Sequence, residues 1–194
     1  MKKICYLFIP LLLLSSCISI SFTGLRIGID KLSNEQKQQV VMVPADKIIN
    51  TAMVNDGKIY AVTGSQLRDC MQKLDTCLVY TWSPHCKGEN CMLLSAVQDY
   101  CSANGYKLFV VADYINFEQI IQQASSLEYP MFIANVDYYQ TDVCRKCNTA
   151  FAKDLLLDSY DASNYSRYRI FAYGNYIKSM SRPSMPEKFQ TIEY

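Results

Sequence analysis

Cysteine is the residue type whose number and spacing in this chain could do chemistry. The sequence holds nine cysteines, and four of them form two close pairs: Cys86 with Cys91, and Cys144 with Cys147. Cysteine acts as a thiolate, either as the nucleophile of disulfide exchange or as a ligand of zinc. The pairs therefore predict a redox-active thiol site or a tetrahedral metal site.

The residues around Cys86 favour thiol chemistry. His85, the only histidine of the chain, directly precedes it, and an imidazolium there would stabilise a thiolate, whereas a neutral ring could serve as a base. The alternative is a partly exposed ring without a chemical role. Because we expect a helix to begin close behind Cys86, its positive dipole end would also lower the pKa of this thiol.

The spacing limits how Cys86 and Cys91 can meet. Five positions on an unbroken helix turn the chain through about 500°, which leaves the two side chains roughly 140° apart. A disulfide between them therefore requires a loop, and Gly88 and Asn90 permit one.

The other pair, Cys144 and Cys147, leaves several interpretations open. With Arg145 and Lys146 between them to lower a thiol pKa, the two cysteines could be redox-active. They could also form a local structural disulfide or stay unpaired. All four paired cysteines together could hold zinc.

The first seventeen residues predict where the chain is sent. A basic start is followed by an apolar stretch, residues 4–14, which is shorter than the ~20 residues of a membrane-spanning helix. Small residues then lead to Cys17, the pattern of an export signal. Leu14-Ser15-Ser16-Cys17 resembles a bacterial lipobox, which implies cleavage before Cys17 and attachment of palmitate or a similar lipid to it. A stray cysteine behind a plain signal peptide is the alternative.

Export places the mature protein in the bacterial cell envelope, tethered to a membrane and facing the periplasm. Once Cys5 leaves with the signal peptide at residues 1–16 and Cys17 carries lipid, seven cysteines remain in an oxidising compartment, where disulfides persist. The same compartment weighs against a zinc site.

Composition and charge exclude several classes of protein. Half of the residues are hydrophobic and 19% are charged, which excludes a disordered, collagen-like or coiled-coil chain. A net charge of +1 lacks the basic footprint of a nucleic-acid binder. The sequence shows no nucleotide-binding loop, so we expect no cofactor and no nucleic-acid partner.

Alternating strands and helices must position the cysteines. After an extension, residues 17–57, with a short helix behind Ser33, we expect a domain at 58–180 and a tail at 181–194. Periodicity predicts strands at 58–63, 77–82, 107–112 and 131–136. It also predicts one helix that begins behind Ser65 as its cap, and three more at 93–104, 117–127 and 148–157. A hairpin is expected at 168–180, turning at 174–175. This order predicts an α/β sandwich with a mostly parallel sheet and one antiparallel edge.

The chain resembles the thioredoxin superfamily, particularly its exported members. A strand and a helix precede a buried strand that ends in Trp82 and a small residue, and Cys86 follows three residues past Ser83. The later helix, strand and hairpin keep the family's order over residues 58–180. The resemblance implies a thioredoxin-like three-layer sandwich, here with an inserted strand and helix at about 130–160.

The resemblance also implies a function. Cys86 would be the nucleophile and Cys91 the resolving thiol of a thiol–disulfide oxidoreductase that acts on protein thiols or disulfides. Trp82 and Pro84 would shape the site, and His85 would tune the thiolate.

Two departures from the family keep other functions open. The family has two residues between its cysteines, whereas this chain has four. The family also has a cis-proline before its terminal hairpin, where residues 166–169 of this chain contain no proline; Pro130 is the other candidate for that role. In a second register, Ser83 takes the place of the nucleophile and the dithiol is lost. The alternatives are a redox-inactive thioredoxin-like binding module and a zinc-stabilised domain.

Overall fold

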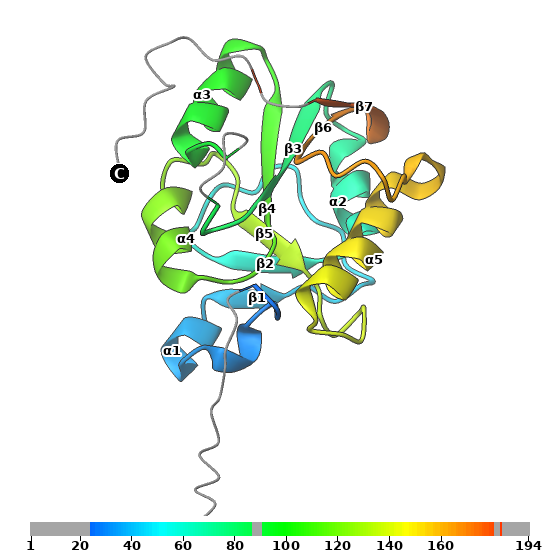
Figure 1. The fold of residues 1–194 in the computed structure, drawn as a ribbon. Helices are drawn as coiled ribbons and strands as arrows, with labels where there is room; N and C mark the ends of the chain where they lie inside the picture. The colour runs from blue at the N-terminus through cyan, green and yellow to red at the C-terminus, as the bar shows by residue number, and fades with distance from the viewer. Residues whose placement is uncertain (1–23, 87–90, 181–182, 184–194) are drawn as a thin grey trace, which may run out of the picture.

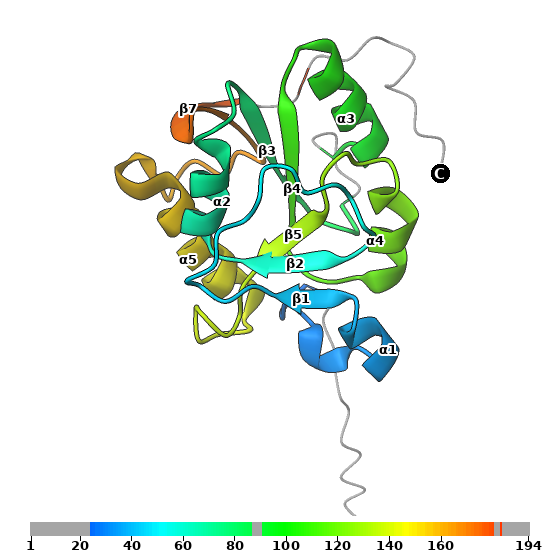
Figure 2. The ribbon, with the colours of Figure 1, turned by 180° about the vertical axis from the view of Figure 1, so that it is seen from behind.

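The chain folds around one mixed β-sheet with helices on both faces (Figure 1). The computed structural model describes residues 24–86, 91–180 and 183. In this part of the chain seven strands form the sheet, in the order β1-β2-β5-β4-β3-β6-β7 (Figures 1 and 2). The strands are β1 (Val40–Met42), β2 (Ile59–Val62), β3 (Cys77–Trp82), β4 (Lys107–Ala112), β5 (Met131–Ala134), β6 (Tyr168–Ala172) and β7 (Asn175–Met180).

The strand directions match the predicted mixed sheet. Strands β1, β2, β5, β4 and β3 run parallel to their neighbours, whereas β6 runs antiparallel to β3 and to β7. The central strands are buried along almost their whole length, as expected of parallel strands covered on both faces. The α/β sandwich with an antiparallel terminal hairpin is therefore confirmed, and it is consistent with a thioredoxin-like sandwich.

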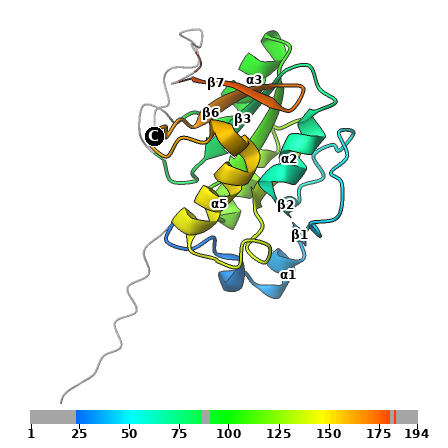
Figure 3. The same ribbon diagram turned by 90° about the vertical axis from the view of Figure 1, so that its right-hand side faces the viewer.

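The helices complete three layers. Helices α2 and α5 pack together on one face, in front of the sheet in Figure 3, and α3 and α4 pack together on the other face. The helices are α1 (Asn34–Lys37), α2 (Gly64–Met71), α3 (Leu94–Ala103), α4 (Phe117–Ala124) and α5 (Cys144–Leu156), with single 3₁₀ turns at Ile29–Lys31 and Leu157–Ser159. No helix in the described part of the chain is long and apolar enough to cross a membrane.

The starts of α2 and α5 differ from the predicted positions. Thr63, not Ser65, caps α2: its side chain accepts from the Gln66 amide while the Gln66 side chain accepts from the Thr63 amide, a capping box. Helix α5 begins at Cys144, earlier than predicted, because its N-cap Val143 has no capping side chain to mark it. The Cys144 amide instead donates to the Leu25 carbonyl at 2.9 Å.

The predicted N-terminal extension also contributes to the sheet. Its short helix behind Ser33 is present with the expected capping box, but β1 extends the sheet at one edge, beside β2. The three residues of β1 are apolar but only half-buried, and so short a run does not by itself predict a strand. The sheet therefore begins at Val40, inside the segment that the sequence presents as an extension.

Gly64 allows α2 and α5 to approach closely. A methyl group at this position would lie against the Phe151 carbonyl oxygen and 2.5 Å from the Leu155 amide nitrogen. Both obstacles are backbone atoms, so only a separation of the two helices would relieve the contact. We expect Gly64→Ala to lower the free energy of unfolding by about 1–3 kcal/mol, despite the higher helix propensity of alanine.

Urea denaturation followed by circular dichroism measures this effect. Asp69→Ala is the matched control, because Asp69 is an exposed residue on the same helix and should change stability by less than about 0.5 kcal/mol. A Gly64→Ala protein as stable as the wild type would show that the helices can separate without cost.

Candidate functional site

Cys86 and Cys91 form a disulfide in the connection between β3 and α3, with their Cα atoms 5.8 Å apart. The chain turns after β3, where the Cys86 amide donates to the Ser83 carbonyl at 3.1 Å. The two bonded cysteines are five positions apart, a separation at which an unbroken helix would hold their side chains apart. Residues 87–90 lie outside the described residues.

The helix that follows the disulfide begins too far from Cys86 for its dipole to lower the pKa of that thiol. Helix α3 starts at Leu94, with Leu93 as its N-cap, so neither cysteine is helical. The Leu94 amide donates to the Gln123 side chain at 3.3 Å. The expectation that a helix begins close behind Cys86 is wrong, because residues 91–93 are not helical and α3 starts only at Leu94, one residue after the predicted start at 93.

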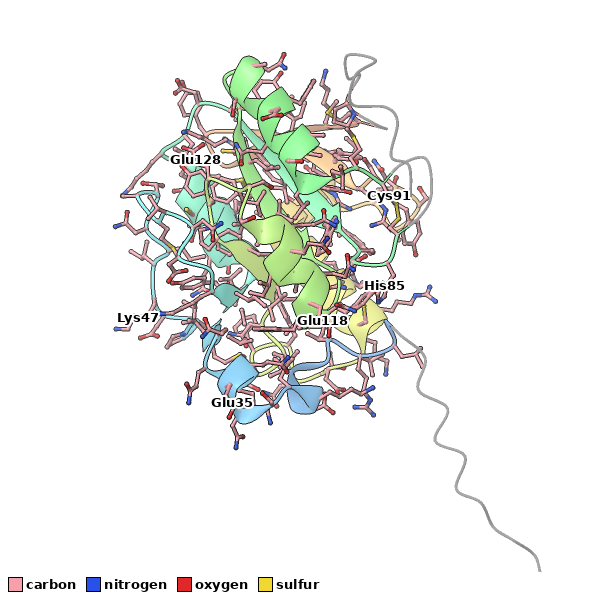
Figure 4. All side chains as sticks on the ribbon, turned by 90° about the vertical axis from the view of Figure 1, so that its left-hand side faces the viewer. Glu35, Lys47, His85, Cys91, Glu118 and Glu128 are labelled. Carbon is pink, nitrogen blue, oxygen red and sulfur yellow. A yellow bond between two sulfur atoms is a disulfide. The ribbon has the colours of Figure 1, made fainter. Side chains whose placement is uncertain are left out.

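His85 is exposed and faces the start of α4. Its Nε2 atom is 2.9 Å from the Asn116 side-chain nitrogen, and its ring centroid is 6.3 Å from that of Tyr114. Asn116 in turn caps α4 by accepting from the Gln119 amide. Figure 4 shows His85 and Cys91 at the same edge of the molecule, with His85 on the side toward Glu118. The tuning of a thiolate by His85 stays a prediction.

A pocket of about 320 Å³ lies beside the disulfide. Trp82 is 3% exposed and Pro84 is also buried, so both belong to the buried part of the pocket lining. Both cysteines and His85 also line the pocket, and the remaining lining comes from the ends of β3, α3 and α4: Ser83, Met92, Leu93, Gln119 and Gln123. The residues expected to shape the site are thus brought together with the disulfide.

The other five described cysteines are buried thiols. Burial raises the pKa of Cys77 and of Cys101 to about 12, and that of Cys70 to about 11. These three pack within the hydrophobic core, as small apolar groups do.

The second close pair is part of the fold. Burial raises the pKa of Cys144 to about 11 and that of Cys147 to about 12, while Arg145 and Lys146 are exposed. The interpretation in which these cations lower a thiol pKa is therefore wrong, and the structure shows two unpaired thiols. The Cys144 thiol donates to the Asp113 carbonyl at 3.1 Å.

The structure also argues against the zinc site. Cys86 and Cys91 bond to each other rather than to a metal, and in residues 24–86 and 91–180 no three His, Cys, Asp or Glu side chains are grouped to hold a metal ion. The four paired cysteines thus do not form the tetrahedral set that the sequence left open.

Arg167 stands directly before β6, where the family has its cis-proline. Its carbonyl accepts from the Thr81 amide at 2.8 Å, and no peptide bond of the described residues is cis. Pro130 precedes β5, which is parallel to β4 and β3 in the sheet, so it lies at the end of the sheet opposite the cysteines. Pro130 therefore cannot fill that role.

Ser83, Asp113 and Arg167 form a hydrogen-bonded trio behind the disulfide pocket. The Ser83 hydroxyl donates to the Asp113 carboxylate and accepts from the Arg167 guanidinium at 3.1 Å, and Arg167 is 3.5 Å from the same carboxylate. Burial raises the pKa of Asp113, and the bonds from Ser83 and Arg167 oppose that rise. Sequence analysis did not identify this trio, although a charged residue directly after a buried strand is a usable signal for Asp113.

The raised pKa of Asp113 makes stability depend on pH. The carboxyl group binds its proton more tightly in the folded chain than in the unfolded chain, where its pKa is about 3.9. Its contribution to the free energy of unfolding therefore falls as the pH rises from about 3.9 through the folded pKa. Asp113→Asn cannot ionise, so its stability relative to the wild type should increase over that window and then level off.

Urea denaturation of both proteins at a series of pH values tests this dependence. Ser83→Ala should steepen the fall with pH, since it removes a bond that lowers the pKa of Asp113. A relative stability of Asp113→Asn that decreases with rising pH would show that the ion pair with Arg167 outweighs burial.

The candidate site is defined by its geometry. That geometry is a disulfide at the carboxyl end of β3, a pocket beside it, and a polar trio behind it. No protein-family model matches the chain, and neither a curated protein nor a solved structure matches it significantly.

Proposed function

We propose that this chain is a membrane-tethered thiol–disulfide oxidoreductase that acts on protein thiols or disulfides in the periplasm. The observation that carries the proposal is the contrast among the seven described cysteines. Five are buried, whereas Cys86 and Cys91 are partly exposed, bonded to each other and beside a pocket. Accessible cysteines are the ones that exchange, whereas buried ones are inert.

The Cys86–Cys91 pair can either accept two electrons from a partner dithiol or donate two electrons to a partner disulfide. With the disulfide formed, a partner thiolate attacks Cys86, and the thiolate of Cys91 leaves. A second partner thiolate then attacks the partner sulfur of the mixed disulfide and releases Cys86, so that two electrons pass from the partner to the pair. In the reverse direction, Cys86 attacks a partner disulfide and Cys91 resolves the mixed disulfide.

The surroundings of the pair support the assigned roles. Trp82 and Pro84 are buried beneath the pocket and so hold a fixed wall against which a partner chain can lie. Since Cys86 has no helix N-terminus behind it, stabilisation of its thiolate falls to nearby charge, and His85 is the adjacent group that can supply it.

A redox-inactive binding module is the second candidate. It is favoured by the absence of a helix start at Cys86 and by the trans peptide that leads to Arg167. In that case the disulfide would only brace the loop, and the same pocket would hold a partner without exchange.

An insulin-reduction assay separates the two candidates. We expect Cys86→Ala to lower the rate by at least about tenfold, because it removes the nucleophile. Cys144→Ala is the matched control, since it removes a buried thiol outside the pocket, and its rate should stay within about twofold of the wild type. Cys91→Ala should accumulate mixed disulfides, visible by mass spectrometry, because nothing resolves them. A wild-type rate no higher than that of Cys86→Ala would leave the binding module as the function.

The membrane tether makes a separate prediction. Its support is the sequence pattern that ends at Cys17, which lies outside the described residues. In a bacterial host, radioactive palmitate should label the wild-type chain and should not label Cys17→Ala, whose chain should leave the membrane fraction. Equal labelling of both chains would refute the anchor without touching the redox assignment.

A further inference from the structure

A cavity lined by both charged and apolar side chains lies away from the disulfide, between α5 and the sheet. Its volume is about 540 Å³, within the range of small-molecule sites. Helix α5 forms one wall, seen in front of the sheet in Figure 3. The polar lining that matters here comes from Thr81, Asp113, Asn148, Arg167 and Arg169.

Positive charge in this cavity exceeds the negative charge that faces it. The Arg169 guanidinium donates to the Thr81 hydroxyl at 3.1 Å, and no carboxylate of the described residues lies within 4.0 Å of it. Two carboxylates line the cavity, Asp113, which already pairs with Arg167, and Asp161. They face three cations, Arg145, Arg167 and Arg169. Burial lowers the pKa of Arg169, which is the mark of a desolvated cation without a full counter-charge.

A guanidinium in such a place has donors to spare. It carries five N–H groups in a planar fork, and Arg169 spends one nitrogen on a neutral hydroxyl. Carboxylates and phosphates match that fork with two parallel hydrogen bonds. A partly buried cation that lacks a counter-charge is costly, and an anion in the cavity would offset the cost.

The rest of the lining fits an organic body attached to the anion. Phe151, Ala152 and Leu155 supply an apolar wall from α5, and Tyr160 adds an aromatic ring. We propose that this cavity is a binding site for a small organic anion, whose carboxylate or phosphate group lies on Arg169 beside Arg167 and whose apolar part lies along α5. This site is separate from the proposed redox centre and does not depend on it.

Three aromatic probes test the proposal on the oxidised full-length protein at constant ionic strength. Benzoate carries a carboxylate, phenyl phosphate a phosphate, and benzyl alcohol no charge. Isothermal titration calorimetry should show saturable one-site binding of at least one anion, at least about tenfold tighter than that of benzyl alcohol. The tighter anion identifies which of the two acid groups the site takes.

Variants then assign the binding to the cavity. Arg169→Gln should weaken the anion by at least about tenfold and leave benzyl alcohol within about twofold. Lys146→Gln is the matched control: it removes one positive charge from an exposed position on α5, the helix that forms one wall of the cavity, and should leave the affinity unchanged. Ala152→Leu, which fills the cavity without altering charge, should weaken all three probes and serves as the second test if Arg169→Gln fails to fold.

Three results would overturn the proposal. They are no saturable binding of either anion, equal affinity for an anion and benzyl alcohol, or an anion affinity that neither Arg169→Gln nor Ala152→Leu reduces.

Discussion

The pairing of β3 with a strand on each side is the constraint on which the site depends. On one side β3 is in register with β4 from Cys77 opposite Lys107 to Trp82 opposite Ala112. On the other side it runs antiparallel to β6, with Tyr80 opposite Tyr168. These registers bring the residues just beyond the paired segments together, so Ser83, Asp113 and Arg167 meet although they come from three distant parts of the chain.

Burial divides the cysteines of this protein into two chemical kinds. A thiol whose pKa is raised to about 11 or 12, as for Cys144 and Cys101, is almost wholly protonated at neutral pH and cannot exchange. A chain with many cysteines can thus enter an oxidising compartment without forming wrong disulfides once it has folded. Of the seven described cysteines, only the bonded pair Cys86 and Cys91 is partly exposed.

The sequence predicts what depends on local pattern. Residues 77–80 and 108–112 are continuous apolar runs, and β3 and β4 occupy the predicted positions, 77–82 and 107–112, without a shift. Helical geometry excludes a bond between residues five apart on an unbroken helix, and the bonded Cys86 and Cys91 both precede α3. By contrast, Val143 is an N-cap without a capping side chain, so the start of α5 leaves no signal in the sequence, whereas the apolar periodicity predicts the start of α3 to within one residue. The site residues Asp113 and Arg167 depend on strand register, which a sequence without its partner strands does not reveal.

The segment that leads from the N-terminus is fastened to the sheet at a specific place. Arg26 pairs with Val143 in a short antiparallel bridge, the Ile27 amide donates to the Asp142 carbonyl, and the Ile27 carbonyl accepts from the Ile115 amide. A force that pulls this segment away from the sheet would therefore act first on these few backbone hydrogen bonds, and with them on the start of α5 and the loop after β4. The same contact lies beside the cavity that Arg169 lines, since Gly24 and Cys144 belong to the lining of that cavity.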